Sequence, residues 1–86
     1  MNQATEIYSH EFDSIFLRLP PQVQQRIEAR IRELGRRLED FPHYRLKGRP
    51  EFRLRVGDHR IIYWFDVQQN ELNLVTLGHR REVYRF

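Results

Sequence analysis

The spacing of apolar residues changes once along this chain of 86 residues. Residues 12–38 follow the 3.6-residue period of an amphipathic helix, whereas residues 52–77 alternate with the period of two that is typical of a strand. A loop with two prolines and one glycine, FPHYRLKGRPEF at 41–52, separates the two patterns. The change of period predicts helices packed on a sheet, the α+β class. Because so short a chain has no room for a second core, we expect a single domain over 1–86.

A short strand and two helices are predicted before the loop. The strand lies within 4–9, and Pro20 and Pro21 end the first helix. Pro21 also fits the first turn of the second helix, which continues to about Asp40 and completes a helical hairpin. Gly35 costs about 1 kcal/mol inside that helix and is expected where another segment packs closely. The apolar positions are Phe12, Ile15, Phe16 and Leu19 in the first helix, and Val23, Ile27, Ile31, Leu34 and Leu38 in the second.

Three antiparallel strands are predicted after the loop. Gly57-Asp58 forms their first turn, although its order is the reverse of the hairpin-favoured Asp-Gly, and 68–71 forms a polar second loop. The middle strand is the most apolar and therefore central, with Tyr63 and Trp64 in the core. With the first strand these make an antiparallel sheet of about four strands, covered on one face by the helical hairpin. The expected strands are 52–56, 59–65 and 72–77.

Positive charge gathers in the second half of the chain. Residues 1–44 carry six basic and seven acidic residues, a net charge of −1, whereas residues 45–86 carry nine basic and five acidic residues, a net charge of +4. Of the fifteen basic residues only Lys47 is a lysine. Arginine presents a planar, permanently charged fork of donors that suits phosphate, although a GC-rich genome would also enrich arginine. The asymmetry predicts that the second half binds a polyanion, most simply a nucleic acid.

Several classes of protein are excluded by what the sequence lacks. Without cysteine there are no disulfides and no cysteine-based zinc sites. The N-terminal MNQATEIYSHEF lacks the basic and apolar regions of a signal peptide, and no apolar stretch approaches the ~20 residues of a membrane span. We therefore expect a cytoplasmic protein with no membrane partner. Glycine-rich phosphate loops, the HExxH motif and carboxylate clusters for Mg²⁺ are also absent, so neither a metal nor a cofactor is expected.

Arginines converge on one face of the predicted sheet. Alternation turns Arg53 and Arg55 away from the apolar side chains of their strand, and Arg60 begins the neighbouring strand on the same side, with Ile62 and Trp64 following it. The closing segment LGHRREVYRF at 77–86 adds more basic groups, an imidazole and a phenol. Such a cluster repels itself unless an anion neutralises it, so we predict a phosphate site on an open concave face. The groups that the closing segment adds are His79, Arg80 and Tyr84.

Each of these groups also has an ordinary structural interpretation. The arginines could form a solvated face paired with Glu51, Asp58 and Glu82. His79 could be a surface histidine, and Tyr84 could pack its ring against the domain. An imidazole is nevertheless well suited to proton transfer at neutral pH, and a phenol ring can stack on an unpaired RNA base.

Two blocks of the sequence resemble the RelE/ParE superfamily of type II toxins. RLRVGDHRIIYWF at 53–65 is similar to the pattern R-x-R-V-G-D-Y-R-x-x-Y, and LGHRREVYRF at 77–86 is similar to G-H-R-x-x-V-Y. LKG at 46–48 is also typical, and the resemblance spans nearly the whole chain. It implies the fold of these toxins and a cognate antitoxin protein that silences the toxin. An acidic disordered segment that folds on binding would suit a basic face.

The RelE branch of the superfamily implies an activity. Its members are ribosome-dependent mRNA interferases that enter the ribosomal A site and cut mRNA by attack of a 2′-hydroxyl on the adjacent phosphate. This chain would then be a metal-independent endoribonuclease that inhibits translation, with mRNA and the rRNA of the A site as partners. ParE-type toxins share the fold but poison DNA gyrase and generally lack the C-terminal tyrosine, present here as Tyr84. A gyrase inhibitor is therefore the alternative, and a noncatalytic RNA- or protein-binding module is a third.

The resemblance also implies roles for individual residues. Arg55 and Arg60 would stabilise the negative charge that develops on the phosphate, while Arg53 clamps the mRNA backbone. Arg80 would stabilise the departing 5′-oxygen, and Tyr84 would stack on the nucleotide or orient its 2′-hydroxyl. The further RNA-binding residues that we expect are Lys47, Arg81 and Arg85.

One departure from the superfamily concerns proton transfer. RelE itself has two lysines where this chain has Arg53 and Arg55, and a guanidinium does not deprotonate near neutral pH. The glutamate that some relatives carry before the second strand is missing from 44–46. His79, which sits where RelE has another basic residue, is therefore the first candidate for a general base, and Tyr84 is the second.

Overall fold

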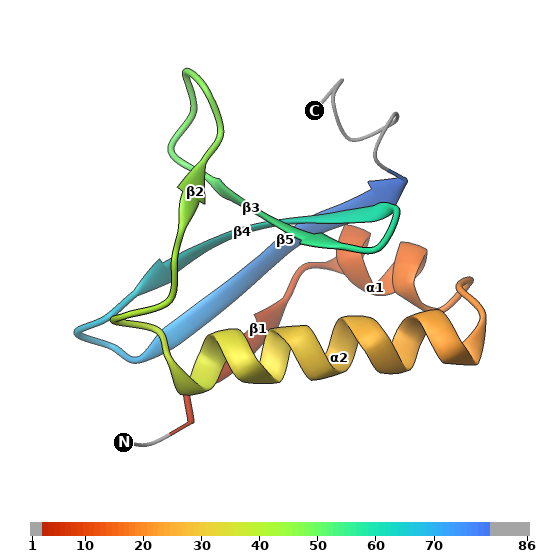
Figure 1. Cartoon of the computed structure of the whole chain (residues 1–86), viewed down its shortest axis with the longest axis horizontal. Helices are drawn as coiled ribbons and strands as arrows, with labels where there is room; N and C mark the ends of the chain where they lie inside the picture. The colour runs from red at the N-terminus through yellow and green to blue at the C-terminus, as the bar shows by residue number, and fades with distance from the viewer. Residues whose placement is uncertain (1–2, 80–86) are drawn as a thin grey trace.

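The computed structural model describes residues 3–79, in which two helices pack on one face of a five-stranded sheet (Figure 1). The elements in chain order are β1 (Thr5–Tyr8), α1 (His10–Phe16), α2 (Pro21–Arg36), β2 (Tyr44–Arg45), β3 (Phe52–Val56), β4 (His59–Asp66) and β5 (Glu71–His79). The spatial order of the strands is β1-β5-β4-β3-β2. β1 runs parallel to β5, and the other neighbouring pairs are antiparallel. The predicted α+β class, with its helical hairpin and three-strand meander, is confirmed, but the sheet is mixed rather than wholly antiparallel because β1 pairs parallel with β5.

The strand β2 lies inside the segment that was expected to be a loop. Tyr44 and Arg45 pair with Arg53 and Phe52 of β3. The sheet therefore has five strands rather than about four. The strand β2 was not predicted because two residues are too few to show an alternating pattern. The connection between β2 and β3, residues 46–51, projects from the sheet on the side away from α2 (Figure 1). We call residues 44–52 the β2–β3 hairpin.

Side-chain hydrogen bonds define both ends of α1. Ser9 Oγ accepts from the amide of Phe12 at 2.9 Å and caps the helix, and the same hydroxyl donates to the carbonyl oxygen of Val75 in β5. At the other end, the side-chain amide of Gln24 in α2 donates to the carbonyl oxygen of Phe16 at 2.9 Å. These contacts satisfy backbone groups that a helix terminus leaves without partners.

The helix α2 begins at Pro21, as predicted, and ends at Arg36, sooner than the apolar spacing indicated. Leu38 lies beyond the helix but remains buried, which explains why the periodic pattern continued past the helix end. The N-terminal segment crosses the last turn of α2, where the amide of Ala4 donates to the carbonyl oxygen of Gly35 at 3.2 Å. A Cβ at Gly35 would lie 3.7 Å from Cβ of Ala4 but only 2.6 Å from Nε2 of Gln3, so the glycine makes room for the tip of the Gln3 side chain.

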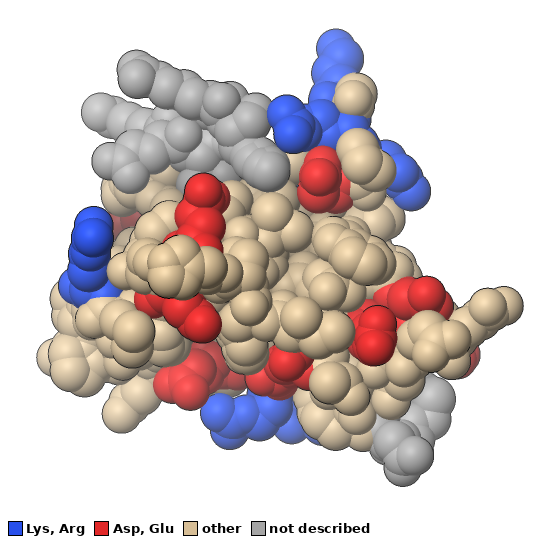
Figure 2. Space-filling model, turned by 180° about the vertical axis from the view of Figure 1, so that it is seen from behind, with Lys and Arg blue, Asp and Glu red and all other residues tan. Residues whose placement is uncertain are grey.

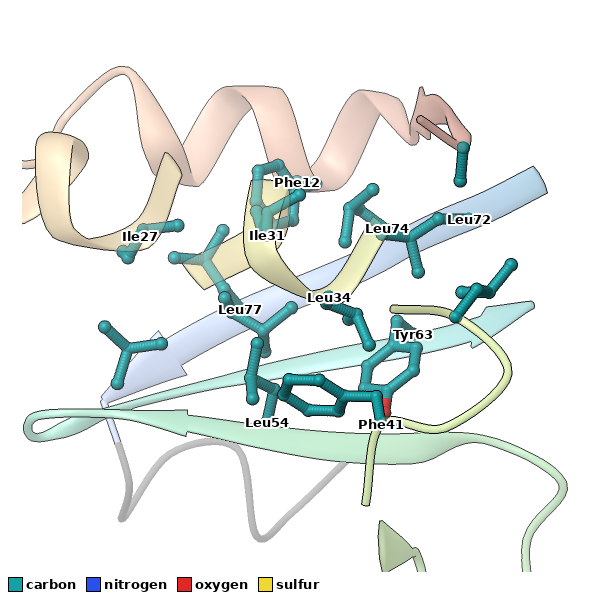
Figure 3. Close-up of a cluster of buried hydrophobic side chains, with 14 residues drawn as sticks. Phe12, Ile27, Ile31, Leu34, Phe41, Leu54, Tyr63, Leu72, Leu74 and Leu77 are labelled. Carbon is teal, nitrogen blue, oxygen red and sulfur yellow. The ribbon is translucent and has the colours of Figure 1, made fainter. Parts of the chain in front are cut away.

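The core lies between the helices and the sheet (Figure 3). The predicted alternation is confirmed along β3 and β4, since Leu54 and Val56 of β3 and Ile61 and Tyr63 of β4 all contribute to the core. Burial of apolar surface is the main source of stability in a domain of this size. The core side chains that are at most 1% exposed are Phe12, Ile27, Ile31, Leu34, Ile61, Tyr63, Leu72, Leu74 and Leu77.

A hydrogen-bonded pair joins the loop after α2 to the centre of the sheet. Tyr63 Oη lies 2.6 Å from His43 Nδ1, and His43 Nε2 lies 2.8 Å from the carbonyl oxygen of Leu38. In the neutral imidazole Nε2 carries the proton, because a carbonyl oxygen only accepts, and Nδ1 then accepts from the Tyr63 hydroxyl. The His43 ring also stacks on Phe65, with ring centroids 4.0 Å apart. Burial raises the pKa of Tyr63 well above its ordinary value.

Trp64 does not have the burial predicted for it. Its side chain is 45% exposed, whereas that of its neighbour Tyr63 is fully buried. Successive residues of a strand point to opposite faces of the sheet, so two adjacent aromatic residues cannot both enter a core that covers one face. The assignment of Trp64 to the core is therefore wrong.

The turn between β3 and β4 suits its reversed Gly-Asp order. Gly57 has a φ of +60°, whereas Asp58 is not among the residues with positive φ. This combination matches a type II′ turn, in which glycine takes the first central position. The hairpin therefore does not require the Asp-Gly order that favours a type I′ turn.

A β-bulge in β5 reverses the side-chain pattern of that strand. Residues 62 and 63 of β4 pair with Thr76 and Leu74, so Val75 between them has no partner on β4. Leu74 before the bulge and Leu77 after it both face the core. Regular alternation from Leu74 would have turned Thr76 toward the helices instead. The bulge therefore exchanges the faces of every later residue of β5.

Candidate functional site

Three arginines lie on the face of the sheet opposite the helices, which we call the arginine face. Arg55 of β3 pairs directly with Arg60 of β4, while Arg53 pairs with Ile62, so all three arginines start from the same face. Side chains paired directly across antiparallel strands have Cβ atoms about 5 Å apart. The strand pairing thus brings together the three arginines that alternation had predicted.

Arg55 and Arg60 differ in their exposure. Arg55 is exposed, and its Nε donates to the carbonyl oxygen of Gly57 at 3.2 Å, which restrains the side chain near the β3–β4 turn. Arg60 is only 9% exposed. A charge that is shielded from water interacts more strongly with an approaching anion, because the effective dielectric constant around it is low. A phosphate at this pair of residues would therefore meet one accessible arginine and one arginine that is shielded from water.

A mixed row of side chains continues the arginine face next to this pair. Arg53 lies between Tyr44 of β2 and Ile62 of β4, and its guanidinium carbon is 5.3 Å from the centre of the Tyr44 ring. This distance is that of a cation–π contact. Tyr44 is 57% exposed, whereas Ile62 and Thr76 are buried. The face is accessible over β2 and β3 but not over the middle of β4 and β5, so it is less open than predicted.

His79 lies on the other face of the sheet from the three arginines. It pairs with His59, and the two rings meet edge to face with centroids 6.2 Å apart. Both histidines line a groove of about 350 Å³ against α1, together with Arg18. The bulge at Val75 is the cause, since it turns His79 toward the helix-covered face. The structure therefore does not group His79 with the arginine pair.

The β2–β3 hairpin carries a second cluster of basic side chains. Lys47 is exposed on the projecting connection, and Arg45 at its base lies over the ring of Phe52, with the guanidinium carbon 4.7 Å from the ring centre. Figure 2 shows basic side chains gathered where the hairpin stands out from the domain, at the upper right of the view. Lys47 thus lies at the opposite end of β3 from Arg55.

The other predicted site residues lie outside the described part of the chain: they are Arg80, Arg81, Tyr84 and Arg85. Within residues 3–79 there is no group of three or more histidine or acidic side chains that could hold a metal ion. None of the helices in the same range is long and apolar enough to cross a membrane.

Sequence reasoning assigned no role to two aromatic residues of the arginine face, Tyr44 and Trp64. Alternation from Arg60 correctly placed Trp64 on this face, since residues 60, 62 and 64 point the same way, but the apolar character of its strand had predicted that Trp64 is buried in the core. Tyr44 had no such signal, because its position depends on the pairing of β2 with β3.

Comparison with known proteins gives a family and a fold. Residues 1–84 match the family model described as the ParE toxin of type II toxin–antitoxin system, parDE. No curated protein matches the chain by sequence.

Solved toxin structures match by fold. A chain of the toxin–antitoxin complex RelBE2 from Mycobacterium tuberculosis has 21% identity and a TM-score of 0.74, with 93% of this chain and 94% of that chain covered. The archaeal RelE–RelB complex from Pyrococcus horikoshii has 20% identity and a TM-score of 0.75, covering 92% and 97%. The isolated E. coli RelE toxin has 15% identity and a TM-score of 0.76, covering 95% and 92%. These TM-scores establish a shared fold, and at identities this low they establish the fold alone.

Proposed function

The chain belongs to the ParE toxin family of type II toxin–antitoxin systems, within the RelE/ParE superfamily, and we propose that it is an endoribonuclease that cleaves mRNA in the ribosomal A site. The observation that carries the proposal is the Arg55–Arg60 pair with Arg53 beside it on one face of the sheet. Permanently charged, planar donors at this density suit the phosphates of a nucleic acid. The net charge of +4 in residues 45–86 supports the same substrate class.

The proposed reaction is an in-line displacement at a phosphodiester. The ribose 2′-oxygen bonds to the adjacent phosphorus as the bond from phosphorus to the 5′-oxygen breaks, which leaves a 2′,3′-cyclic phosphate and a 5′-hydroxyl. The 2′-hydroxyl loses its proton, and the departing 5′-oxygen gains one. Negative charge develops on the phosphate oxygens meanwhile, and Arg55 and Arg60 stabilise it.

The arginine pair is preorganised for this role. Arg55 is restrained by its hydrogen bond to the Gly57 carbonyl oxygen, and Arg60 is restrained by burial. Donors that are held in place before the reaction stabilise the transition state without a reorganisation cost. Arg53, held against the ring of Tyr44, clamps the RNA backbone next to the reacting phosphate.

We assign proton transfer to Tyr84 in the closing segment of the chain. The guanidinium groups cannot accept a proton, and His79 lies with His59 on the helix-covered face. We therefore do not assign the general base to His79. Tyr84 orients the 2′-hydroxyl and takes part in proton transfer, while Arg80 stabilises the departing 5′-oxygen, as the resemblance implies.

The proposed macromolecular partners are a cognate antitoxin, mRNA and the rRNA of the A site. The RelE structures from M. tuberculosis and P. horikoshii are complexes of toxin with antitoxin, which supports the first partner. An acidic segment that folds on binding would neutralise the arginine face. The residues proposed to contact RNA phosphates away from the reacting bond are Lys47, Arg81 and Arg85.

Primer extension on translating ribosomes tests the proposal. The wild-type protein is expected to produce cuts within codons of an mRNA that is being translated, and the double variant Arg55→Ala/Arg60→Ala is expected to produce none. Arg26→Ala, a change at an exposed arginine of α2, is the matched control and should cut like the wild type. Absence of cuts with the wild type, or unchanged cuts with the double variant, would refute the proposed activity.

A gyrase inhibitor is the second candidate function, because the matching family model is that of the ParE toxin. Such a toxin would cause double-strand breaks in DNA and a DNA-damage response while cellular mRNA stays intact. Measuring both DNA breaks and mRNA ends after expression of the wild type separates the two candidates.

A further inference from the structure

A groove of about 480 Å³ lies between the base of the β2–β3 hairpin and the end of β4. This volume is in the range of pockets that hold small ligands, roughly 300–1,000 Å³. Its lining is mostly apolar or aromatic, with one arginine and one carboxylate. The lining residues are Arg45, Pro50, Glu51, Phe52, Trp64 and Phe65.

Trp64 is the most unusual residue of this groove. It is the only tryptophan of the chain, and 45% of its side chain is exposed. Leaving so much of a large aromatic side chain in water forgoes stabilisation that burial would supply. Tyr44, the other exposed aromatic residue of the arginine face, is adjacent to Arg53 one row away. Two exposed rings beside arginines form a surface on which flat aromatic ligands stack.

The arginines around the groove favour an unpaired nucleotide as its occupant. Arg45 lines the groove with its guanidinium over the ring of Phe52, while Arg53 lies outside the groove on the arginine face with its guanidinium over the ring of Tyr44. Planar cations held against rings can both stack on a base and attract the neighbouring phosphate. An acidic peptide would satisfy the charges but would leave the flat aromatic surfaces without a matching partner.

The acidic residues near the groove indicate which part of the nucleotide enters it. Glu51 lines the groove and forms an ion pair with Arg49, with Nε and Oε1 3.4 Å apart. Beyond Trp64 on the same face, Asp66 of β4 lies opposite Glu71 of β5 in the strand register. The carboxylates of Asp66 and Glu71 repel phosphate at this end of the sheet, so the base occupies the groove and the backbone runs back toward the arginines.

We propose that the groove around Trp64 is a stacking subsite for an unpaired base of the RNA whose reacting phosphate lies at Arg55 and Arg60. The proposal rests on the proposed endoribonuclease function. Trp64 lies four residues along β4 from Arg60, about 13 Å at the rise of a strand, and Arg53 lies beside the midpoint. A short stretch of extended nucleotides spans that distance. Stacking tolerates any base, so the subsite contributes affinity rather than codon preference.

The fluorescence of Trp64 reports the proposed contact directly. The full-length wild type is titrated with a short single-stranded oligonucleotide that is 2′-O-methylated throughout and cannot be cleaved. A matched oligonucleotide has the same phosphates but abasic sugars. The base-containing strand is expected to quench Trp64 fluorescence and the abasic strand is not, because only a base can stack on the indole.

Two variants test the contribution of the ring to affinity. By fluorescence anisotropy of a labelled strand, Trp64→Ala is expected to bind about 5- to 100-fold more weakly than the wild type, while Trp64→Phe keeps most of the affinity. Leu17→Ala, at an exposed leucine after α1, is the control and should bind like the wild type. Thermal melts verify that each variant is folded.

Equal quenching by both oligonucleotides, or unchanged binding by Trp64→Ala, would overturn the stacking subsite. So would a Trp64→Ala variant that binds RNA normally but loses a co-expressed antitoxin, since the groove would then be a protein-binding site. Ribosome cleavage is measured in parallel. Cuts by the wild type without a Trp64 response would refute the subsite alone, whereas quenching without cuts would refute the proposed activity alone.

Discussion

His79 and His59 pair directly across β5 and β4, with their rings 6.2 Å apart on the face of the sheet that the helices cover. Arg60 and Gly78 are the next pair along the same strands, and the side chain of Arg60 points to the other face. The sheet therefore separates the two imidazoles from the guanidinium groups. The chemistry proposed for the arginine face depends on groups whose charge does not change near neutral pH.

Replacing Arg60 with alanine is expected to lower the rate of mRNA cleavage about 10²- to 10³-fold, the usual effect of removing one donor to a developing negative charge. Arg60→Lys keeps the charge but loses the planar fork, so it should recover only part of the rate. Single-turnover primer extension on stalled ribosomes measures both variants. Because Arg60 is nearly buried, thermal melts must show that both are folded. Wild-type rates for Arg60→Ala would remove this residue from the proposed site.

His79→Ala is expected to lower the cleavage rate less than about tenfold, whereas loss of a general base costs about 10²- to 10⁴-fold. The reason is that His79, although exposed, lies beside His59 in the groove against α1, on the opposite face of the sheet from the arginine pair. The same assay on His59→Ala provides the matched control, and the two variants should behave alike. A loss with His79→Ala as large as that with Arg60→Ala, while His59→Ala stays active, would restore His79 as the general base.

Tyr63→Phe is expected to lower the free energy of unfolding by about 1–3 kcal/mol, because it leaves the Nδ1 acceptor of His43 without its donor. Urea denaturation of the wild type, Tyr63→Phe, His43→Phe and the double variant measures the coupling between the two residues. The double variant should be less destabilised than the sum of the single changes. Strict additivity would mean that the hydrogen bond contributes nothing measurable.

The stability of the wild type is expected to fall as the pH rises above about 10, the ordinary pKa of tyrosine. Burial raises the pKa of Tyr63, and partial burial followed by a hydrogen bond to Glu6 raises that of Tyr8, which is 36% exposed and so contributes less than Tyr63; both rings stay neutral in the folded state while the unfolded chain ionises. A raised folded pKa gives stability that is complete below the unfolded pKa and is lost above it. Denaturation between pH 9 and 12 should therefore show a steep fall for the wild type.

The corresponding phenylalanine variants identify the source of this pH dependence. Tyr63→Phe and Tyr8→Phe should each flatten the curve of stability against pH, and the double variant should flatten it most. An unchanged slope in the double variant would assign the alkaline instability to other groups.

Gly35→Ala is expected to raise the free energy of unfolding by about 0.5 kcal/mol, less than the full helix-propensity gain of about 1 kcal/mol. A Cβ at this position would lie 2.6 Å from Nε2 of Gln3, so the tip of that side chain must move and lose its hydrogen bond to the Arg32 carbonyl oxygen. Thermal melts of Gly35→Ala in the wild-type and Gln3→Ala backgrounds measure the two effects. The gain should be larger when Gln3 is already truncated, and equal gains would show that the contact costs nothing.

Local patterns predicted the parts of the fold in which each residue's environment follows from its neighbours along the chain. Pro21 marked the start of α2, and the period of two along β3 gave the correct faces to Leu54 and Arg55. The strand β2 could not be predicted because its two residues are a strand only through pairing with β3. His43 likewise gave no signal, since its partner Tyr63 is distant in the sequence.

The sequence by itself determined the α+β class and the grouping of Arg53, Arg55 and Arg60, because alternation along β3 and across one tight turn is a local property. Only the tertiary structure decided where His79 points. The bulge at Val75 is a feature of the pairing between two strands: residues 62 and 63 of β4 pair with the residues on either side of Val75. No local pattern in the sequence of β5 reveals that register. A shift of one residue in pairing turns every later side chain to the opposite face, and this shift separated the imidazole from the arginines.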